Sequence, residues 1–353
     1  MNRLSFKYKN SVLLAKIKEH KANSILLQDE RNLFWYCGIK NLVGFCLVTT
    51  KKNYLLVDQR YFFEIKNKLN GFIVIKYLSI NDLINLLKKF KLKKILIESD
   101  YLTLERFQKI SSLIKEKLNI SLINFSSKFI RVLKTDEEIQ LMKKSAIIAA
   151  NCINWIKTKL KIGVTEKQIK NLILKYWDDH NCDGPSFSPI VAFGKNSAIP
   201  HHTPTNKKLD KNEIVKLDIG CIYQGYCSDI TRTFLMGNEE AKKIYDIVLK
   251  ANLTAIKSIK INKSKINDID SNARTIIKKA GYGAYFTHYT SHGLGIEIHE
   301  KITDHNNKEN LKNNMIFTIE PGIYLPNKFG IRIEDMILIK NNKIFVLTKN
   351  AKK

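Results

Sequence analysis

The strongest constraint on the fold of this chain is a pair of aspartates inside an apolar hairpin. Residues 213–234 have the sequence EIVKLDIGCIYQGYCSDITRTF, which predicts two strands joined by a tight turn, with Asp218 in the first strand and Asp229 in the second. A turn at the dipeptide YQ would place the two aspartates directly opposite each other, whereas a turn at QG would make them diagonal neighbours. In both registers, two carboxylates share one face of a strand pair that is otherwise mostly apolar or small.

Two buried carboxylates this close together need a positive partner. Their negative charges repel each other, and removal from water raises the cost of ionising each of them. One or two divalent cations bound between them would remove this conflict. The alternatives are that both aspartates lie exposed beside the loop, or that one of them is protonated. The hairpin by itself therefore suggests a metal site only as a hypothesis, and other segments of the sequence have to support it.

Two histidines lie in a glycine-containing segment further along the chain. The string TSHGLGIEIHE, residues 290–300, contains His292 and His299 and is predicted to be a strand segment. The glycines that follow His292 allow another part of the backbone to approach closely. An isolated histidine is more often a core or surface residue than a ligand, but two in one such segment favour a site.

Two glutamates are predicted near strand ends in the last part of the sequence. Glu320 ends the apolar strand of MIFTIEPGIY, directly before Pro-Gly, where a buried glutamate needs a partner. In GIRIEDM the polar residues Arg332 and Glu334 alternate with isoleucines, so their side chains share one face. The alternative for this last pair is a simple salt bridge on the exposed face of a strand.

Together these segments supply four carboxylates and one imidazole as candidate metal ligands: Asp218, Asp229, His292, Glu320 and Glu334. Such a set suits two hard divalent ions that share bridging carboxylates. Oxygen-rich ligation favours Mn²⁺ over a thiolate-bound zinc, with Co²⁺ or Zn²⁺ as alternatives at the same ligands. The site needs none of the six cysteines.

The order of these residues in their local strings resembles the pita-bread dinuclear metallopeptidases, the family of methionine aminopeptidase, aminopeptidase P and prolidase. The resemblance rests on the two aspartates eleven positions apart, on the pattern H-G-x-G-x-x-x-H-E that begins at His292, and on E-P-G at Glu320. It covers the chain from about Arg131 to the C-terminus. It implies an α+β pita-bread catalytic domain that binds two divalent ions.

The resemblance also implies a role for each metal ligand. Asp218 would bind one ion, and Asp229 and Glu334 would bridge both ions. His292 and Glu320 would bind the other ion. Glu320 would in addition take a proton from the attacking water as a general base.

Further site residues follow from the same resemblance. In the string NSAIPHHTP, His201 matches a histidine of the family, whereas its neighbour His202 is expected to be structural or peripheral. His201 and His299 would stabilise the tetrahedral oxyanion. Arg332 would orient a bridging carboxylate, and His288 matches a histidine of many proline-directed members.

The first part of the chain has the pattern of an α/β domain. Strands are predicted at residues 24–29, 44–50, 53–58, 72–78 and 94–99, and helices at residues 80–90 and 103–118. Strands that alternate with helices favour an α/β sandwich. The sheet-like pattern then stops, and two domains are expected, residues 1–128 and 129–353. Capping boxes at Thr135 and Thr165 predict the first two helices of the second domain.

The N-terminal part narrows the expected function. Residues 31–65 and the string RVLKTDEEI resemble the creatinase-like domain that precedes the catalytic domain in aminopeptidase P, prolidase and creatinase. Creatinase lacks the metal ligands present here. The resemblance therefore implies an Xaa-Pro aminopeptidase, which releases the first residue of peptides with proline in second position. A prolidase restricted to dipeptides is one alternative, and a non-catalytic peptide- or protein-binding module on the same fold is another.

Composition bears on partners and compartment. The net charge of +27 comes mainly from evenly spread lysine, and the chain has only eight arginines, so no specific nucleic-acid site is expected. No window approaches the ~18 apolar residues of a membrane span, and no signal peptide is evident. Cysteines without a C-x-x-C pair favour reduced thiols in the cytoplasm. The expected partners are proline-containing peptides and, by resemblance, a second copy in a homodimer.

Overall fold

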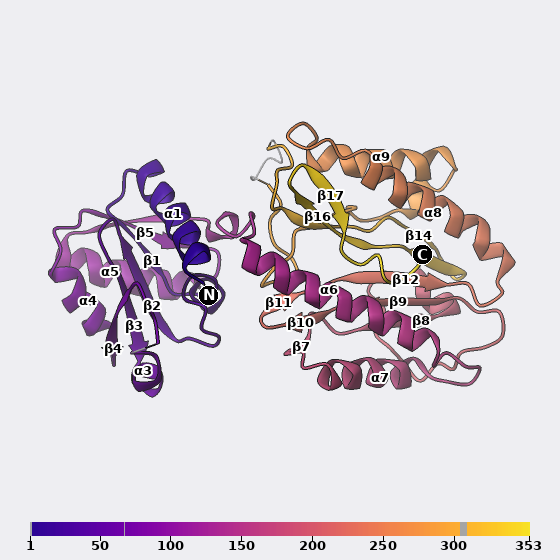
Figure 1. Cartoon of the computed structure of the whole chain (residues 1–353), viewed down its shortest axis with the longest axis horizontal. Helices are drawn as coiled ribbons and strands as arrows, with labels where there is room; N and C mark the ends of the chain where they lie inside the picture. The colour runs from indigo at the N-terminus through magenta and orange to yellow at the C-terminus, as the bar shows by residue number, and fades with distance from the viewer. Residues whose placement is uncertain (1, 67, 304–308) are drawn as a thin grey trace. The chain divides into compact units, whose positions relative to one another are not determined.

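The computed structural model describes residues 2–66, 68–303 and 309–353 of the chain. It divides the chain into two compact units, Met1–Arg131 and Val132–Lys353 (Figure 1). Both units combine helices with sheets, as the sequence predicted for an α/β domain followed by an α+β domain.

The first unit is built on a six-stranded mixed sheet with the order β4-β3-β2-β1-β5-β6. Its strands are β1 (Ser24–Leu27), β2 (Gly44–Thr49), β3 (Asn53–Asp58), β4 (Phe72–Tyr77), β5 (Lys94–Glu98) and β6 (Ser121–Phe125). β1, β2 and β3 pair antiparallel, whereas β4, β5 and β6 are joined by parallel pairings. The sequence predicted the first five strands to within two residues at their ends, and β6 is an addition.

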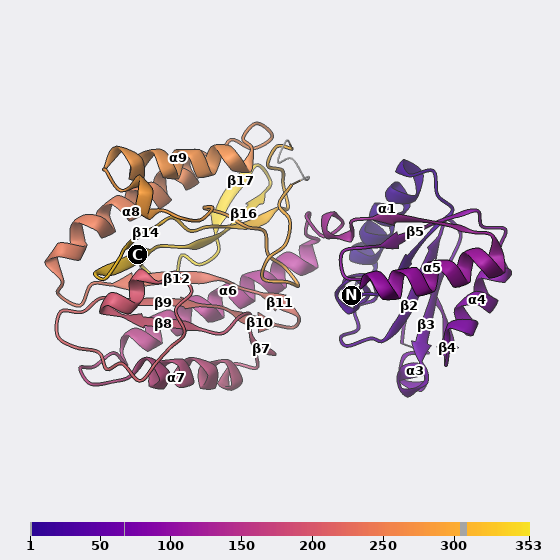
Figure 2. The same ribbon diagram turned by 180° about the vertical axis from the view of Figure 1, so that it is seen from behind.

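Helices cover both faces of this sheet. They are α1 (Arg3–Glu19), α2 (Glu30–Cys37), α3 (Gln59–Ile65), α4 (Ile80–Lys88) and α5 (Leu104–Leu118). α4 and α5 lie on one face and α1 on the other, as the two opposite views show (Figures 1 and 2). Leu83 and Leu87 of α4 and Ile114 of α5 belong to one buried cluster with Leu26 and Phe45 of the sheet, so the apolar faces of these helices close the core.

The second unit has two helix pairs with strands between them (Figure 1). Its helices are α6 (Asp136–Lys157), α7 (Glu166–Asp179), α8 (Glu239–Lys257) and α9 (Ile266–Lys279). α6 and α7 begin at the two predicted capping boxes, in which Thr135 pairs with Glu138 and Thr165 with Gln168. Side chains that the sequence alone identifies therefore fix the first turns of both helices.

The strands of the second unit form small sheets with the orders β12-β9-β8, β13-β16-β17, β11-β10-β7 and β14-β15. They are β7 (Gly184–Pro185), β8 (Ile190–Phe193), β9 (Val215–Ile219), β10 (Cys221–Tyr223), β11 (Tyr226–Cys227), β12 (Ile230–Phe234), β13 (Ile316–Ile319), β14 (Gly322–Leu325), β15 (Phe329–Arg332), β16 (Asp335–Lys340) and β17 (Lys343–Val346). Several site residues lie at the ends of these short strands, where the chain changes from one sheet to another.

Each helix pair packs on its own layer of strands. Ile153 of α6 and Ile173 of α7 share a buried cluster with Leu217 of β9 and Ile230 of β12. α8 and α9 cover the other layer, formed by β13 to β16. Because both cores are apolar, they hold the two strand layers face to face and leave the polar residues between them.

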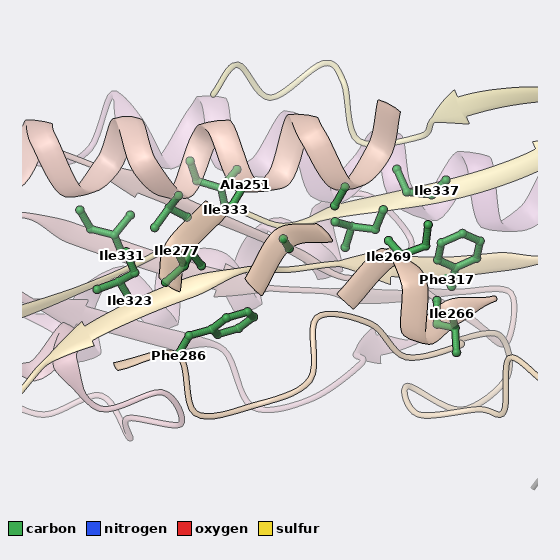
Figure 3. Close-up of a cluster of buried hydrophobic side chains, with 14 of the residues drawn as sticks. Ala251, Ile266, Ile269, Ile277, Phe286, Phe317, Ile323, Ile331, Ile333 and Ile337 are labelled. Carbon is green, nitrogen blue, oxygen red and sulfur yellow. The ribbon is translucent and has the colours of Figure 1, made fainter. Parts of the chain in front are cut away.

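Figure 3 shows the core under α8 and α9. Ala251 of α8 and Ile277 of α9 belong to the same buried cluster as Phe317 of β13, Ile331 of β15 and Ile337 of β16. These strands carry the segments around the two glutamates predicted as ligands. The core therefore fixes the backbone on which that part of the site is built.

The aspartate hairpin has the second of the two registers considered from the sequence. Asp218 of β9 lies opposite Thr231 of β12, so Asp229 is its diagonal neighbour. The turn residues are Gln224 and Gly225, both with positive φ, at 48° and 86°. Such a turn matches the twist of two adjoining strands.

The hairpin passes from one small sheet to the next at Gly220. A Cβ atom on this residue would lie 2.0 Å from the carbonyl oxygen of Ser228, so only glycine fits at this crossing. β9 is buried along its whole length, and Asp218 and Asp229 are only 6% and 5% exposed. The alternative of exposed aspartates at a loop is therefore wrong.

Five of the six cysteines are buried and Cys182 is half-buried, all as free thiols. In the part of the chain that the structure describes, no helix is both long and apolar enough to cross a bilayer.

Candidate active site

A cavity of about 400 Å³ in the second unit brings together every residue that the sequence proposed for the site. Those residues are His201, Asp218, Asp229, His288, His292, His299, Glu320, Arg332 and Glu334. Phe187, Ile190, Pro200 and Ile298 contribute apolar wall. The volume is within the range of small-ligand pockets, about 300 to 1,000 Å³.

Backbone pairing brings the carboxylates to this cavity. Glu334 lies between β15 and β16, and its N–H donates to the Thr231 carbonyl over 3.1 Å, which places Glu334 beside the aspartate hairpin. Arg332 and Glu334 are each 2% exposed and line the cavity. The alternative of a salt bridge on an exposed strand face is therefore wrong for this pair.

His292 and Glu320 are brought together by a second backbone pairing. The Thr318 N–H donates to the His292 carbonyl over 2.9 Å, and the Glu320 N–H donates to the Thr290 carbonyl over 2.8 Å. Residues 290–300 are not the strand that the sequence predicted, because they form a loop with isolated bridges at Gly293. A Cβ atom on Gly293 would lie 2.7 Å from the Lys301 carbonyl oxygen, so glycine is required for this close approach.

Three side chains already have the spacing of a metal site. One ligand atom each from Asp229, His292 and Glu334 lie within 4.8 Å of one another. The Nε2 atom of His292 is 3.4 Å from an oxygen of Asp229 and 3.4 Å from an oxygen of Glu320. Its Nδ1 atom lies 3.0 Å from the Gly293 carbonyl oxygen, so Nδ1 carries the proton and Nε2 is free to act as a ligand.

The carboxylates repel one another strongly. Burial, followed by the charges of Asp218 and Glu320, raises the pKa of Asp229 well above its ordinary value. Burial, followed by the charge of Asp229, raises the pKa of Glu334 in the same way. Burial also raises the pKa of Glu320. Ionising all of these groups together therefore requires positive charge beyond the protein's own.

The donor set fits divalent cations. One oxygen of Asp218 and one of Asp229 are buried and accept no hydrogen bond from any described residue. A buried carboxylate oxygen without a partner is costly unless a cation binds it. Carboxylate oxygens and one imidazole are the ligands that Mn²⁺ and similar ions accept.

Arg332 supplies the fixed positive charge of the cavity. Its Nη2 atom donates to Asp218, its Nε atom donates to the Thr231 hydroxyl over 3.0 Å, and its Nη1 atom donates to the Tyr324 hydroxyl over 2.7 Å. The Thr231 hydroxyl in turn donates to Glu334 over 2.8 Å. Arg332 therefore donates a hydrogen bond to Asp218 directly, and a chain of hydrogen bonds through Thr231 links it to Glu334.

Tyr324 is a site residue that the sequence reasoning missed, although it lies two residues after the E-P-G string. Its hydroxyl lies 2.8 Å from Nε2 of His288, whose Nδ1 lies 2.8 Å from the Tyr289 carbonyl oxygen. Because Arg332 donates to the tyrosine oxygen, the hydroxyl proton points to His288. Burial, followed by the charge of Arg332, lowers the pKa of His288 to about 4, so this histidine is neutral at pH 7.

The remaining histidines divide into two groups. His299 lies against His292 with ring centroids 4.5 Å apart, and burial, followed by the charge of His292, lowers its pKa. His201 lines the cavity beside Pro200. His202 lies outside the cavity lining, with Nε2 2.9 Å from an oxygen of Glu166. Adjacent histidines thus have different surroundings, which the string PHH alone does not indicate.

Comparison with known proteins assigns both units to the families that the sequence motifs resembled. Residues 140–341 match metallopeptidase family M24, and residues 11–132 match the creatinase/prolidase N-terminal domain. The first match covers more than half of the chain, and the second covers most of the first unit. The resemblance stated from the sequence motifs is therefore confirmed.

Relatives and a solved structure extend the match over nearly the whole length. An uncharacterised peptidase of Staphylococcus epidermidis is 38% identical, over 96% of this chain and 100% of the relative. A Mycoplasma genitalium protein named "Putative Xaa-Pro aminopeptidase" is 35% identical, over 97% of each chain. The structure of an Xaa-Pro dipeptidase from Bacillus anthracis has a TM-score of 0.90 at 32% identity, over 98% of each chain. The chain therefore belongs to metallopeptidase family M24, with a pita-bread catalytic domain that follows a creatinase-type N-terminal domain.

Proposed function

We propose that this protein is an Xaa-Pro aminopeptidase that uses two divalent ions to release the first residue of peptides with proline in second position. The observation that carries the proposal is the convergence of the five candidate ligands, four carboxylates and the imidazole of His292, in one cavity that the Arg332 guanidinium also lines. Membership of family M24 supports a peptidase. The similar Mycoplasma protein, named for Xaa-Pro aminopeptidase activity, supports the bond that is cleaved.

The proposed ligands are the five residues identified from the sequence. Asp218 would hold one ion, and Asp229 and Glu334 would bridge both. His292 and Glu320 would hold the second ion. The oxygen-rich set favours Mn²⁺, with Co²⁺ or Zn²⁺ as alternatives. When bound, divalent ions polarise a carbonyl and lower the pKa of water from ~15.7 toward ~7.

Side chains of this protein would handle the proton and the developing charge. Glu320 takes a proton from the attacking water as that oxygen bonds to the carbonyl carbon of the first residue. His299 and His201 donate hydrogen bonds to the oxygen on which negative charge develops. The proton then passes to the proline nitrogen as the carbon–nitrogen bond breaks, which yields a free amino acid and a peptide with an N-terminal proline.

The walls of the cavity support a small apolar group next to the scissile bond. Phe187, Ile190 and Ile298 flank the polar residues and would contact a proline ring. The carboxylates would attract the free amino group of the substrate. Together these features favour cleavage at the N-terminus over cleavage within a chain.

Replacing His201 with alanine tests the proposed oxyanion donor. Because one such donor contributes about 10²-fold to 10³-fold to rate, we expect kcat to fall by at least about tenfold. Metal content, measured by atomic emission after gel filtration, should stay at the wild-type value because His201 is not a proposed ligand. Unchanged turnover in this variant would remove His201 from the reaction.

A substrate panel separates the candidate functions. Protein stripped with a chelator and reloaded with Mn²⁺ should cleave both Ala-Pro dipeptide and Ala-Pro-Ala tripeptide, and the stripped protein should cleave neither. Cleavage of the dipeptide alone would assign a prolidase, an alternative that the likeness to the Bacillus dipeptidase favours. Peptide binding without hydrolysis in the reloaded protein would instead assign a binding module.

The cytoplasmic location, the homodimer and the absence of a specific nucleic-acid partner stay predictions. Cell fractionation, sedimentation and DNA binding at physiological salt would test them.

A further inference from the structure

His201 owes its position to its backbone. Its side chain is exposed to the cavity and makes no hydrogen bond to any residue that the structure describes. A hydrogen-bond donor for an oxyanion must nevertheless be held in place, because a displacement of about 1 Å can cost ~10²-fold in rate. The contacts of the segment 193–205, which carries His201, therefore decide whether this histidine can act.

One buried carboxylate joins the two ends of this segment. Glu166, the first residue of α7, is 0% exposed. Its Oε1 atom accepts hydrogen bonds from the Phe193 N–H and the Asn196 amide, each over 2.9 Å. Its Oε2 atom accepts from the N–H and the hydroxyl of Thr205, over 2.8 and 2.7 Å. Although burial raises the pKa of Glu166, hydrogen bonds from His202 first, and then from Thr205, Asn196 and Phe193, lower it by more, so the group is an anion.

His202 makes the fifth contact to the same carboxylate. Its Nε2 atom lies 2.9 Å from Oε2 of Glu166, and the residue is only 8% exposed. Its neighbour His201 lines the cavity. With one of two consecutive histidines held by Glu166, the other is directed to the opposite side, where the proposed reaction takes place.

A buried lysine supports the middle of the segment. The Nζ atom of Lys216, on β9, donates to the carbonyl oxygens of Ser197 and Ile199 over 2.9 and 2.8 Å, and it lies 3.4 Å from that of Pro200. Lys216 is 0% exposed. Hydrogen bonds from two buried side chains thus hold the segment from two sides, those of Glu166 at its ends and those of Lys216 just before His201.

From this geometry we propose that Glu166, through His202 and Thr205, is a positioning residue that holds His201 at the reacting carbonyl. This inference rests on the proposed function, because it gives His201 its task there. Neither Glu166 nor His202 lines the cavity, so neither would contact the substrate. Their effect on catalysis would pass entirely through His201.

Glu166→Gln keeps the size of the side chain but replaces one carboxylate oxygen with an NH₂ group. That group cannot accept the hydrogen bonds that the segment donates to Glu166. We expect kcat for Ala-Pro-Ala to fall by about 10-fold to 10²-fold, with KM and metal content unchanged. In a His201→Ala background, Glu166→Gln should lower kcat by no more than about twofold. The reason is that both substitutions remove the same interaction, the hydrogen bond from His201 to the reacting carbonyl. Ile173→Val, a buried apolar change in the same helix that leaves the hydrogen bonds of Glu166 in place, is the control for lost stability. A full Glu166→Gln loss in the His201→Ala background would overturn the proposal.

A second pair of variants tests the contact between His202 and Glu166 by changing the histidine. His202→Gln can still donate an amide hydrogen bond to Glu166 and should keep most activity, whereas His202→Leu should lose as much as Glu166→Gln. Equal activity of the two variants would contradict the proposed role. This pair also serves if Glu166→Gln does not fold.

A spectroscopic measurement makes the test independent of activity. The ring signal of His201 in a carbon–proton NMR spectrum, identified by its loss in His201→Ala, should move in Glu166→Gln and in His202→Leu. The signal of His180, at the far end of α7, should stay in place and report an intact helix. An unmoved His201 signal would overturn the positioning role. Wild-type protein that cleaves no Xaa-Pro peptide would refute the proposed function instead, while the ring signal would still decide this inference.

Discussion

Replacing Asp229 with asparagine should abolish binding of the divalent-ion pair and lower kcat/KM for Ala-Pro-Ala by about 10³-fold or more. Asp229 is the proposed bridging ligand, and it lies within ligand distance of His292 and Glu334. A bound ion contributes several kcal/mol of charge stabilisation in the transition state, and about 4 kcal/mol corresponds to ~10³-fold in rate. Metal content and steady-state kinetics measure the two effects separately.

The stability of this variant provides a sharper test than its activity. Without metal, Asp229 is repelled by Asp218 and Glu320, and a neutral amide removes that repulsion. The metal-free variant should therefore unfold at a temperature no lower than that of metal-free wild type, although it is inactive. Asp183→Asn, which changes a carboxylate that contacts the hairpin turn at Gly225, should keep its metal and its activity. Full Xaa-Pro cleavage by Asp229→Asn would refute the metal assignment.

Replacing Glu320 with glutamine should lower kcat by about 10²-fold to 10⁴-fold, the usual contribution of a general base. The amide cannot take a proton, and it is also a poorer ligand than a carboxylate. The other proposed ligands are unchanged, so we expect metal content to fall from two ions to about one. Single-turnover kinetics with the reloaded protein would separate the loss of the chemical step from weaker substrate binding.

Thr318→Val is a milder variant that disturbs Glu320 without removing its carboxylate. The Thr318 hydroxyl donates to Glu320 over 3.3 Å and accepts from the His292 N–H over 3.1 Å. Its removal leaves the carboxylate in place but less well oriented, so the expected loss is only about 10-fold to 10²-fold. If Thr318→Val lost as much activity as Glu320→Gln, orientation rather than proton transfer would explain the Glu320 effect.

The local strings of the sequence determined the composition of the site. Each proposed ligand lies in a short pattern whose chemistry is visible without a structure: two aspartates in an apolar hairpin, a histidine before glycines, and glutamates at strand ends. All of them line one cavity. Capping boxes likewise located the starts of α6 and α7, because the residues that form a cap are close neighbours in the chain.

Only the tertiary structure decided how these pieces meet. The turn at Gln224-Gly225 made the two aspartates diagonal neighbours rather than directly opposite each other. Residues 290–300 form a loop in which Gly293 makes isolated bridges both to Glu300 and to Phe317 of β13. The links from Arg332 to Tyr324 and from His202 to Glu166 join residues on different elements. Local patterns reflect short-range backbone and burial preferences, whereas these contacts depend on how separate elements pack, and no single string encodes that.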